Sequence, residues 1–393
     1  MLEIKEGLYS VGVQNRDLRV FDIIMQTPRG TSYNAFLVKG ESKAALVETV
    51  KDGFGNEYFN SIEEIMPISQ IDYLIINHTE PDHAGTIPKL LQKNPNMQVV
   101  GDSSAITFIT HIINEKFNSR VVKKGDTLDL GGRELSFYPM PNLHWPDTMF
   151  TFDSKTHALF TCDFMGAHYS LDHLLLSQNE NKQQYLEALK QYYLDIMSPF
   201  SQPFVENGIK AVKELKPSII LTGHGALLDT MIGEATTLYE QLAQKPEKNG
   251  KSVAIVYVSA YGYTRMLADA IAEELKTLRL GVKEIELNAQ NKDKALEAIQ
   301  ESDGVLFGSP TFLGDMLQPI GELLAAIHPY LVKGKLASAF GSYGWSGEGV
   351  GNIITRLDQL KVKTIEGYRA RLRPSEEELN GARVFARSFA DAM

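Results

Sequence analysis

The chain has 393 residues, 43% hydrophobic and 22% charged, which is typical of a globular protein large enough for two domains. Its formal net charge of −10 lacks the basic excess of nucleic-acid-binding proteins, so we expect no nucleic-acid partner. Because no apolar signal region follows Met1 and no apolar run is long enough to span a bilayer, we expect a cytoplasmic protein with no membrane partner.

The first part of the chain mixes short strands with helices. Apolar and β-branched runs predict buried strands at residues 45–48, 73–77, 134–140, 149–153 and 219–222. Helical spacing predicts helices at 183–197 and 203–215. Two of the strands end just before His78 and His224, and loops at strand ends are where a rigid sheet can present ligands.

A polar stretch with Pro and Gly, residues 243–251, is the best candidate linker. After it, strands are predicted at 253–258, 282–287, 304–308, 336–340 and 364–367, and helices at 263–278, 293–301, 319–330, 350–359 and from Pro374 onward. This regular alternation predicts a doubly wound parallel sheet of the α/β class. We therefore predict two domains, residues 1–245 and 251–393.

Three loops of the second domain follow predicted strands, at the edge where open α/β sheets bind ligands. The first contains Ser259, Tyr261, Gly262, Tyr263 and Thr264, the second Pro310, Thr311, Phe312, Leu313 and Gly314, and the third Ser342, Tyr343, Gly344, Trp345 and Gly347. In the first loop, hydroxyls and backbone N–H groups converge on a helix N-terminus, which suits a phosphate. The other two loops offer aromatic side chains and exposed backbone, as a flat ring system needs.

These loops resemble those of the flavodoxins, and the resemblance covers the chain from about Lys251 onward. It implies bound FMN, with the phosphate at residues 259–264 and the isoalloxazine ring between the loops at 311–314 and 342–347. Trp345 is a candidate for stacking on the ring, and a packed core tryptophan is the alternative.

The first domain carries His and carboxylate side chains in sufficient number for two metal ions. They are His78, Glu80, Asp82, His83, His144, Asp163 and His224. Two His and two carboxylates fall within six residues, and His224 lies between two glycines, where the lack of side chains lets a metal approach. Cys162, the one cysteine, cannot form a disulfide or a rubredoxin-type pair, and we interpret it as structural.

This layout resembles the metallo-β-lactamase fold, an αββα sandwich whose common motif is His-x-His-x-Asp-His. Here Glu80 replaces the middle His, and harder oxygen ligands favour iron over zinc. With a flavodoxin-like unit behind it, the whole chain resembles the flavodiiron proteins, or A-type flavoproteins. The resemblance implies an oxidoreductase with FMN and two iron ions that detoxifies O2 by reduction to water, NO by reduction to N2O, or both.

The resemblance also implies roles for single residues. One iron would be held by His78, Glu80, His144 and Asp163, and the other by Asp82, His83, Asp163 and His224, with Asp163 bridging. Tyr193 matches a tyrosine near the irons in the family, and helix packing is the alternative. Where many members have a His near the irons, after the equivalent of Phe21, this chain has Asp22. The family further implies a head-to-tail homodimer or a dimer of dimers, and a rubredoxin-like or other electron-donor protein as partner.

Two other functions fit parts of the sequence. A binuclear zinc hydrolase with a flavodoxin-like appendage would use the same donors, and Glu80 argues against it. A non-enzymatic flavin electron carrier would use the first domain only for docking, and the intact donor set argues against that.

Overall fold

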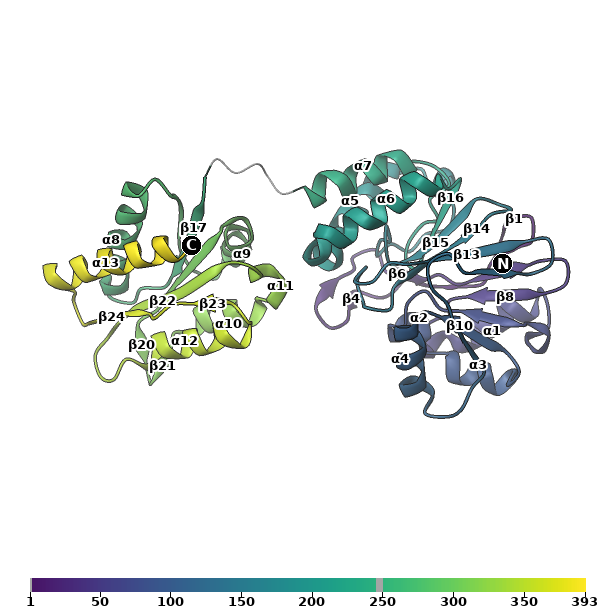
Figure 1. Cartoon of the computed structure of the whole chain (residues 1–393), viewed down its shortest axis with the longest axis horizontal. Coiled ribbons are helices and arrows are strands. Elements are labelled where there is room, and N and C mark those ends of the chain that lie inside the picture. Colours follow the sequence, from purple (N-terminus) through teal and green to yellow (C-terminus); the bar gives the residue numbers. More distant parts are fainter. Residues whose placement is uncertain (1, 245–249) are drawn as a thin grey trace. The chain divides into compact units, whose positions relative to one another are not determined.

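The computed structural model describes residues 2–244 and 250–393. The chain divides into two compact units, Met1–Lys245 and Pro246–Met393 (Figure 1). Of the predicted linker, residues 245–249 lie outside the described residues. Within the described part of the chain, no helix has both the length and the apolar character needed to cross a membrane.

Two β-sheets form the centre of unit 1. The seven-stranded sheet has the order β1 (Leu2–Lys5), β2 (Leu8–Ser10), β7 (Phe36–Lys39), β8 (Ala44–Val47), β9 (Tyr73–Ile75), β10 (Gln98–Gly101) and β11 (Ser119–Val121). The five-stranded sheet has the order β12 (Thr127–Asp129), β13 (Glu134–Pro139), β14 (Met149–Asp153), β15 (Ala158–Cys162) and β16 (Ile219–Thr222). Two further sheets have two strands each. One pairs β3 (Val13–Asn15) with β6 (Thr31–Tyr33), and the other pairs β4 (Val20–Phe21) with β5 (Met25–Gln26).

Helices cover the outer faces of both sheets. On the first sheet lie α1 (Gly55–Glu63), α3 (Ile87–Lys93) and α4 (Ser103–Ile113), and on the second α5 (Lys182–Tyr192), α6 (Glu206–Leu215) and α7 (Ile232–Ala243) (Figure 1). In β8, Leu46 packs among the outer helices, whereas Ala45 and Val47 join the core between the sheets. Because both faces of the strand are buried, it reads as a continuous apolar run. The predicted αββα sandwich is confirmed.

Beside a short two-stranded sheet of β20 (Thr311–Phe312) and β21 (Asp315–Met316), unit 2 has a parallel sheet with helices on both faces. Its strands have the order β18 (Gly281–Glu286), β17 (Ser252–Tyr257), β19 (Gly304–Gly308), β22 (Leu336–Tyr343) and β23 (Lys363–Thr364), and β24 (Tyr368–Arg371) also pairs with β22. One face is covered by α8 (Tyr263–Thr277) and α13 (Glu376–Ala392), the other by α9 (Lys292–Glu301), α10 (Gln318–Ala326) and α12 (Glu348–Gln359). This order is that of flavodoxin-like sheets, and the predicted doubly wound parallel sheet is confirmed.

The helix predicted at 319–330 is wrong as a single element. It is divided into α10 and α11 (Pro329–Val332). Pro329 cannot continue a helix, and it pushes the preceding residue, His328, into an extended conformation (φ −100°, ψ 157°).

The strand predicted at 364–367 is also wrong, because the chain leaves the sheet between β23 and β24. The hydroxyl of Ser338 in β22 donates to the carbonyl oxygens of Ile365 (3.0 Å) and Glu366 (3.3 Å). A side chain thus takes the place of backbone partners at this point of the ladder.

Candidate functional site

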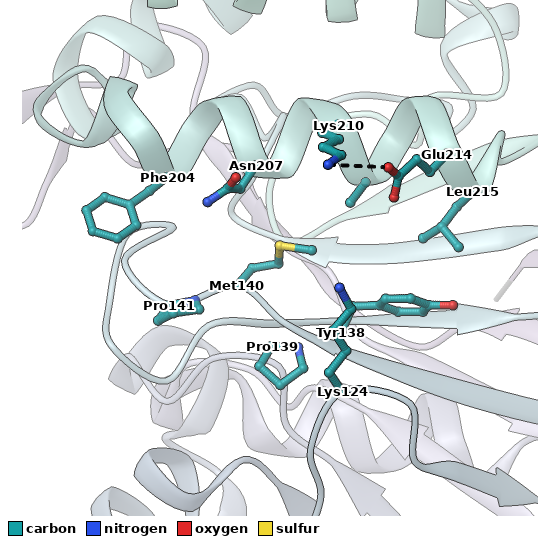
Figure 2. Close-up of a pocket in the computed structure, with 11 residues that line it drawn as sticks. Lys124, Tyr138, Pro139, Met140, Pro141, Phe204, Asn207, Lys210, Glu214 and Leu215 are labelled. Atoms are coloured by element: carbon teal, nitrogen blue, oxygen red, sulfur yellow. Dashed lines mark ion pairs between the residues drawn. The ribbon is translucent and has the colours of Figure 1, made fainter.

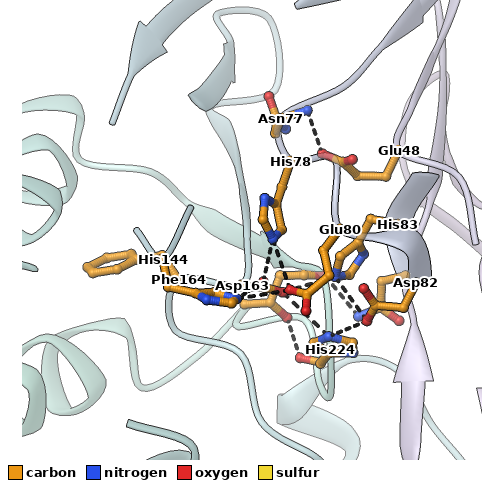
Figure 3. Close-up of polar contacts among 12 residues, drawn as sticks. Glu48, Asn77, His78, Glu80, Asp82, His83, His144, Asp163, Phe164 and His224 are labelled. Carbon is orange, nitrogen blue, oxygen red and sulfur yellow. Dashed lines mark hydrogen bonds and ion pairs between the residues drawn. The ribbon is translucent and has the colours of Figure 1, made fainter. Parts of the chain in front are cut away.

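Strands of both sheets in unit 1 lead to a cluster of His and carboxylate side chains (Figure 3). His78 and Glu80 follow β9, Asp82 and His83 lie in α2 (Pro81–Ala84), His144 lies between β13 and β14, Asp163 follows β15, and His224 follows β16. Five of these residues are buried, and Glu80 and His144 are partly exposed. The structure therefore brings together all seven side chains that were singled out in the sequence.

The cluster contains two main groups of possible metal ligands. One consists of His78, Glu80, His144 and Asp163, and the other of Asp82, His83 and His224. A third group, His83, Cys162 and Asp163, overlaps both. Within each group, one ligand atom from every residue lies within 4.8 Å of the others. Each group combines side chains that follow strands of both sheets.

Asp163 lies between the two groups and turns one carboxylate oxygen toward each. Its Oδ2 is 3.3 Å from Nε2 of His78 and 3.1 Å from Nε2 of His144. Its Oδ1 is 3.0 Å from Nε2 of His83 and 3.4 Å from Nε2 of His224. This is the arrangement that a carboxylate bridging two metal ions requires.

The second half of the His-x-Glu-x-Asp-His stretch, from Pro81, forms the short helix α2 rather than an extended loop. Pro81 occupies the first turn of α2, a position that suits proline. The backbone N–H of His83 donates to the carbonyl of Glu80 (2.9 Å). A helical turn rotates successive side chains around its axis, and it thereby directs Glu80 to one group and both Asp82 and His83 to the other.

Buried polar atoms without partners indicate that the cluster fits metal ions. Neither carboxylate oxygen of Asp82 has a hydrogen-bond partner, although Nε2 of His224 lies 3.2 Å from Oδ2. Burying an ionised carboxylate costs free energy unless a hydrogen bond or an opposite charge compensates for the lost water. A divalent cation would supply that opposite charge. The donors are imidazole nitrogens and carboxylate oxygens, a set that suits iron.

The charges within the cluster keep the carboxylates ionised. Burial by itself would raise the pKa of Asp163, but the charge of His83 and a hydrogen bond with His144 hold it well below its ordinary value. Burial lowers the pKa of His83, whereas the charges of Asp82 and Asp163 outweigh this and raise it to about 9. Without metal, His83 therefore carries a proton at neutral pH.

Metal affinity is accordingly expected to fall as the pH falls. A metal binds the neutral imidazole, so at neutral pH it must displace the proton of His83, and its affinity should rise with pH up to about 9. Calorimetric titration of the apoprotein with Co²⁺, in buffers of different ionisation enthalpy, measures the protons released per ion. An affinity that is constant from pH 6 to pH 9 would contradict this assignment.

Two residues of the Arg29–Asn34 stretch position His224, a role that the sequence did not show. Nδ1 of His224 lies 2.6 Å from the carbonyl oxygen of Ser32 and 3.4 Å from the hydroxyl of Thr31. The same hydroxyl lies 3.0 Å from Nδ1 of His168, whose pKa is lowered to about 3 by burial and by His224. With Nδ1 held by a carbonyl, Nε2 of His224 is left free for a metal.

The tyrosine next to the cluster is Tyr192 rather than the predicted Tyr193. The ring of Tyr192 lies 6.0 Å from that of His224 and 4.9 Å from that of His168. Tyr193 instead forms a hydrogen bond with Ser201 (2.6 Å). The predicted helix at 183–197 ends at Tyr192 and continues as a π-helical turn, Tyr193–Met197. Tyr192 lies on the buried face of α5 with Tyr185 and Leu189, at the spacing of an α-helix.

Two further carboxyl groups lie close to the cluster. Burial and then the charges of Glu80 and Asp82 raise the pKa of Asp22. Glu48 is buried, and its Oε1 accepts a hydrogen bond from the backbone N–H of Asn77 (2.9 Å; Figure 3). Burial raises the pKa of Glu48 to about 8, so this carboxyl is mostly neutral at pH 7.

In unit 2 the three predicted loops meet at the carboxyl edge of the sheet. The hydroxyls of Thr264 and Ser342 are 3.0 Å apart, which joins the first loop to the third. The backbone N–H of Gly349 donates to the hydroxyl of Thr311 (3.2 Å), which joins the third loop to the second. The order of strands reverses between β17 and β19, and such a switch point is where these sheets bind ligands.

The same loops have features that fit FMN. Gly262 precedes α8 with φ +80° and has no side chain to cap the helix. The hydroxyl of Ser259 accepts a hydrogen bond from the N–H of Arg265 (3.3 Å), and the other N–H groups of the first turn suit a phosphate. Tyr261 (85%), Trp345 (83%) and Phe312 (63%) are highly exposed, which is unusual for large aromatic side chains. An aromatic ring system could stack on them. The alternative of a buried core tryptophan is therefore wrong for Trp345.

Replacing Gly262 with valine should weaken FMN binding by about 10-fold or more, because a β-branched residue disfavours φ +80° and would distort the loop. The matched control is Gly334→Val. Gly334 also has a positive φ (+76°) and open space around it, but it precedes β22 at the opposite edge of the sheet. Titration of the apoprotein with FMN by fluorescence measures both; equal losses would contradict a phosphate site at Gly262.

Unit 1 also has a surface cavity of about 370 Å³ between β13 and α6 (Figure 2). Met140 points into it from the strand side, and Phe204 and Leu215 line it from the helix side. Lys210 and Glu214 form an ion pair at its rim (3.7 Å). None of its lining residues belongs to the metal cluster.

Comparison with known proteins gives matches to both units. Residues 31–225 match the model of the ODP family beta lactamases, and residues 255–384 match that of the flavodoxins. A flavo-diiron protein of Clostridium acetobutylicum, FprA2, is 38% identical, and the match covers 100% of this chain and 99% of that protein. The anaerobic nitric oxide reductase flavorubredoxin of Escherichia coli is 32% identical over 98% of this chain and 81% of that protein. The solved structure of rubredoxin oxygen:oxidoreductase from Desulfovibrio gigas superposes with a TM-score of 0.72 at 27% identity, covering 100% of this chain and 98% of that one.

Proposed function

The chain belongs to the flavodiiron protein family, and from that premise we propose that it reduces O2 to water, NO to N2O, or both. It is an oxidoreductase with FMN and a diiron site. We assign one iron to His78, Glu80, His144 and Asp163, and the other to Asp82, His83, Asp163 and His224. We assign FMN to the three loops of unit 2, with domains at residues 1–245 and 251–393.

The observation that carries this proposal is the position of Asp163. Each carboxylate oxygen of Asp163 lies close to the Nε2 atoms of two histidines, so the carboxylate can serve two adjacent metal ions. Two adjacent metal ions are what joining two NO molecules or cleaving O2 requires. When bound, the irons and the flavin together supply the electrons for these reductions. The buried His and carboxylate side chains fix the positions of the metals and exclude bulk water.

Glu80 and His144 provide the approach for a diatomic gas. They are the only members of the donor set that are partly exposed, so the side of the cluster that they form is the one open to a small molecule. We propose that the gas reaches the metals from this side. Asp22, whose pKa is raised by burial and then by the charges of Glu80 and Asp82, is a candidate for tuning the preference between the gases.

Anaerobic stopped-flow mixing of the reduced holoprotein with O2 or NO tests the function directly. We expect at least one gas to reoxidise the flavin within seconds of mixing. We also expect metal analysis to find two irons per chain. Two zinc ions with esterase activity and no gas consumption would instead establish a hydrolase. Gas consumption that persists in a metal-free protein would leave only a flavin electron carrier.

For assembly we propose a head-to-tail homodimer or a dimer of dimers, which the family membership supports. In such a dimer the flavin of one subunit would face the metals of the other. A rubredoxin-like or other electron-donor protein would deliver the electrons in the cytoplasm. Light scattering of fractions assayed for turnover tests the dimer, and a monomer with full activity would contradict it.

A further inference from the structure

Asp147 is a fully buried carboxylate that has no assigned role, although it lies beside the metal cluster. Its Oδ2 accepts two hydrogen bonds from Thr79, one from the backbone N–H (2.7 Å) and one from the hydroxyl (2.8 Å). Its Oδ1 has no hydrogen-bond partner. Thr79 lies between the donors His78 and Glu80, so Asp147 fixes the backbone that carries both.

The free oxygen of Asp147 faces the free nitrogen of His78. Oδ1 of Asp147 and Nδ1 of His78 are both buried, both lack a hydrogen-bond partner, and lie 3.6 Å apart. The other ring nitrogen, Nε2, lies 3.2 Å from Glu80 Oε2 and 3.3 Å from Asp163 Oδ2, inside the metal cluster. The ring of Trp145 packs edge-on against His78 at 5.2 Å and limits its rotation.

We propose that Asp147 is a positioning residue that holds His78 with Nδ1–H toward its carboxylate and with the lone pair of Nε2 toward the metal. A distance of 3.6 Å is slightly too long for a hydrogen bond, and a small shift of the ring toward Asp147 would form one. A carboxylate on the outer nitrogen of a ligating His fixes its tautomer and makes it a better ligand. This inference rests on the metal site proposed above and adds the residue that sets the affinity of one of its two positions.

The test measures metal binding rather than gas reduction. Apoprotein is titrated with Co²⁺ against a chromophoric chelator, and the visible absorption of bound Co²⁺ is recorded for each site. We expect Asp147→Ala to weaken one of the two sites about 10- to 100-fold and to change its spectrum, while the other site is retained. Asp147→Asn should weaken the same site, because its amide oxygen would take the bonds of Thr79 and turn N–H groups toward Nδ1 of His78, which favours the wrong tautomer.

Two variants of Thr79 keep the inference testable if the Asp147 variants fail to fold. Thr79→Val removes one of the two hydrogen bonds to Asp147 and should weaken the same site by a few-fold, whereas Thr79→Ser should keep the affinity of the wild type. Asp153→Asn is the matched control for a buried aspartate. Asp153 lies at the end of β14 and forms an ion pair with Arg133, away from the cluster. It should lower the melting temperature without changing Co²⁺ affinity in the folded protein.

The outcomes separate this inference from the proposed function. Unchanged Co²⁺ affinity and spectrum in Asp147→Ala would overturn the positioning role, whatever the wild type does with O2 and NO. If the wild type consumes neither gas but Asp147→Ala still loses one Co²⁺ site, the positioning role stands and the proposed gas reduction falls. A loss of affinity equal to that of Asp153→Asn would also overturn the role, since it would reflect stability alone.

Discussion

Asp163→Ala is expected to lose both metal ions together and to lower gas reduction by about 100-fold or more. One oxygen of Asp163 faces two histidines of the first ligand group, and the other oxygen faces two histidines of the second. The substitution therefore removes one ligand from each metal position. It also deprives His83 and His144 of one of the two carboxylates that each of them contacts. Iron content per chain and the rates of O2 and NO consumption measure the result.

Two controls accompany this variant. FMN content should stay at the level of the wild type, because the flavin loops lie in unit 2 and Asp163 lies in unit 1. Circular dichroism of the apoprotein shows whether the fold is retained. If Asp163→Ala retains two irons and full turnover, the assignment of the bridge is wrong, and if turnover persists without metal, the first domain is only a scaffold.

Glu80→His is expected to exchange iron for zinc. It restores the His-x-His-x-Asp-His motif of the zinc enzymes, and it replaces a hard oxygen ligand by a nitrogen that suits zinc. Oε2 of Glu80 lies 3.2 Å from Nε2 of His78 and 3.1 Å from Nε2 of His144, so a ligand at this position belongs to the first metal group. The zinc-to-iron ratio of protein produced with both metals should rise about 10-fold or more, and gas reduction should fall in proportion.

Glu80→Gln is the matched control for size, since it keeps the shape of the side chain and removes the charge. It should weaken metal binding without favouring zinc. An unchanged metal ratio in Glu80→His would mean that the other six donors set the choice of metal and that Glu80 does not.

The strands and the donors could be predicted because one physical rule governs both. Strands buried on two faces are continuous apolar runs, as in Ile219–Thr222, and a polar residue can follow only where the run ends. His78 and His224 follow predicted strands, so the ends of apolar runs located them, whereas β15, which precedes Asp163, was not among the predicted strands. Glu80 was informative on chemistry alone, because oxygen and nitrogen ligands prefer different metals.

The residues that orient the donors could not be predicted, because their roles depend on tertiary contacts. Asp147 is separated from Thr79 by 68 positions, and Thr31 from His224 by 193. Nothing in a local pattern shows such pairs. Tyr192 differs from these, because it lies on the buried face of α5 with Tyr185 and Leu189 at helical spacing, although the family resemblance pointed to Tyr193.

Each metal group draws ligands from both sheets of the sandwich, and this ties metal loading to the mechanical integrity of unit 1. His78 and Glu80 follow a strand of one sheet, whereas His144 and Asp163 follow strands of the other, so an ion between them cross-links two layers that are also held by apolar contacts and by hydrogen bonds such as that of Thr79 with Asp147. Binding to the folded state alone adds about 4 kcal/mol at a free metal concentration 1,000 times the Kd. Chelation should therefore lower the free energy of unfolding of unit 1. Iron starvation of a cell would then shorten the lifetime of the protein as well as abolish its activity.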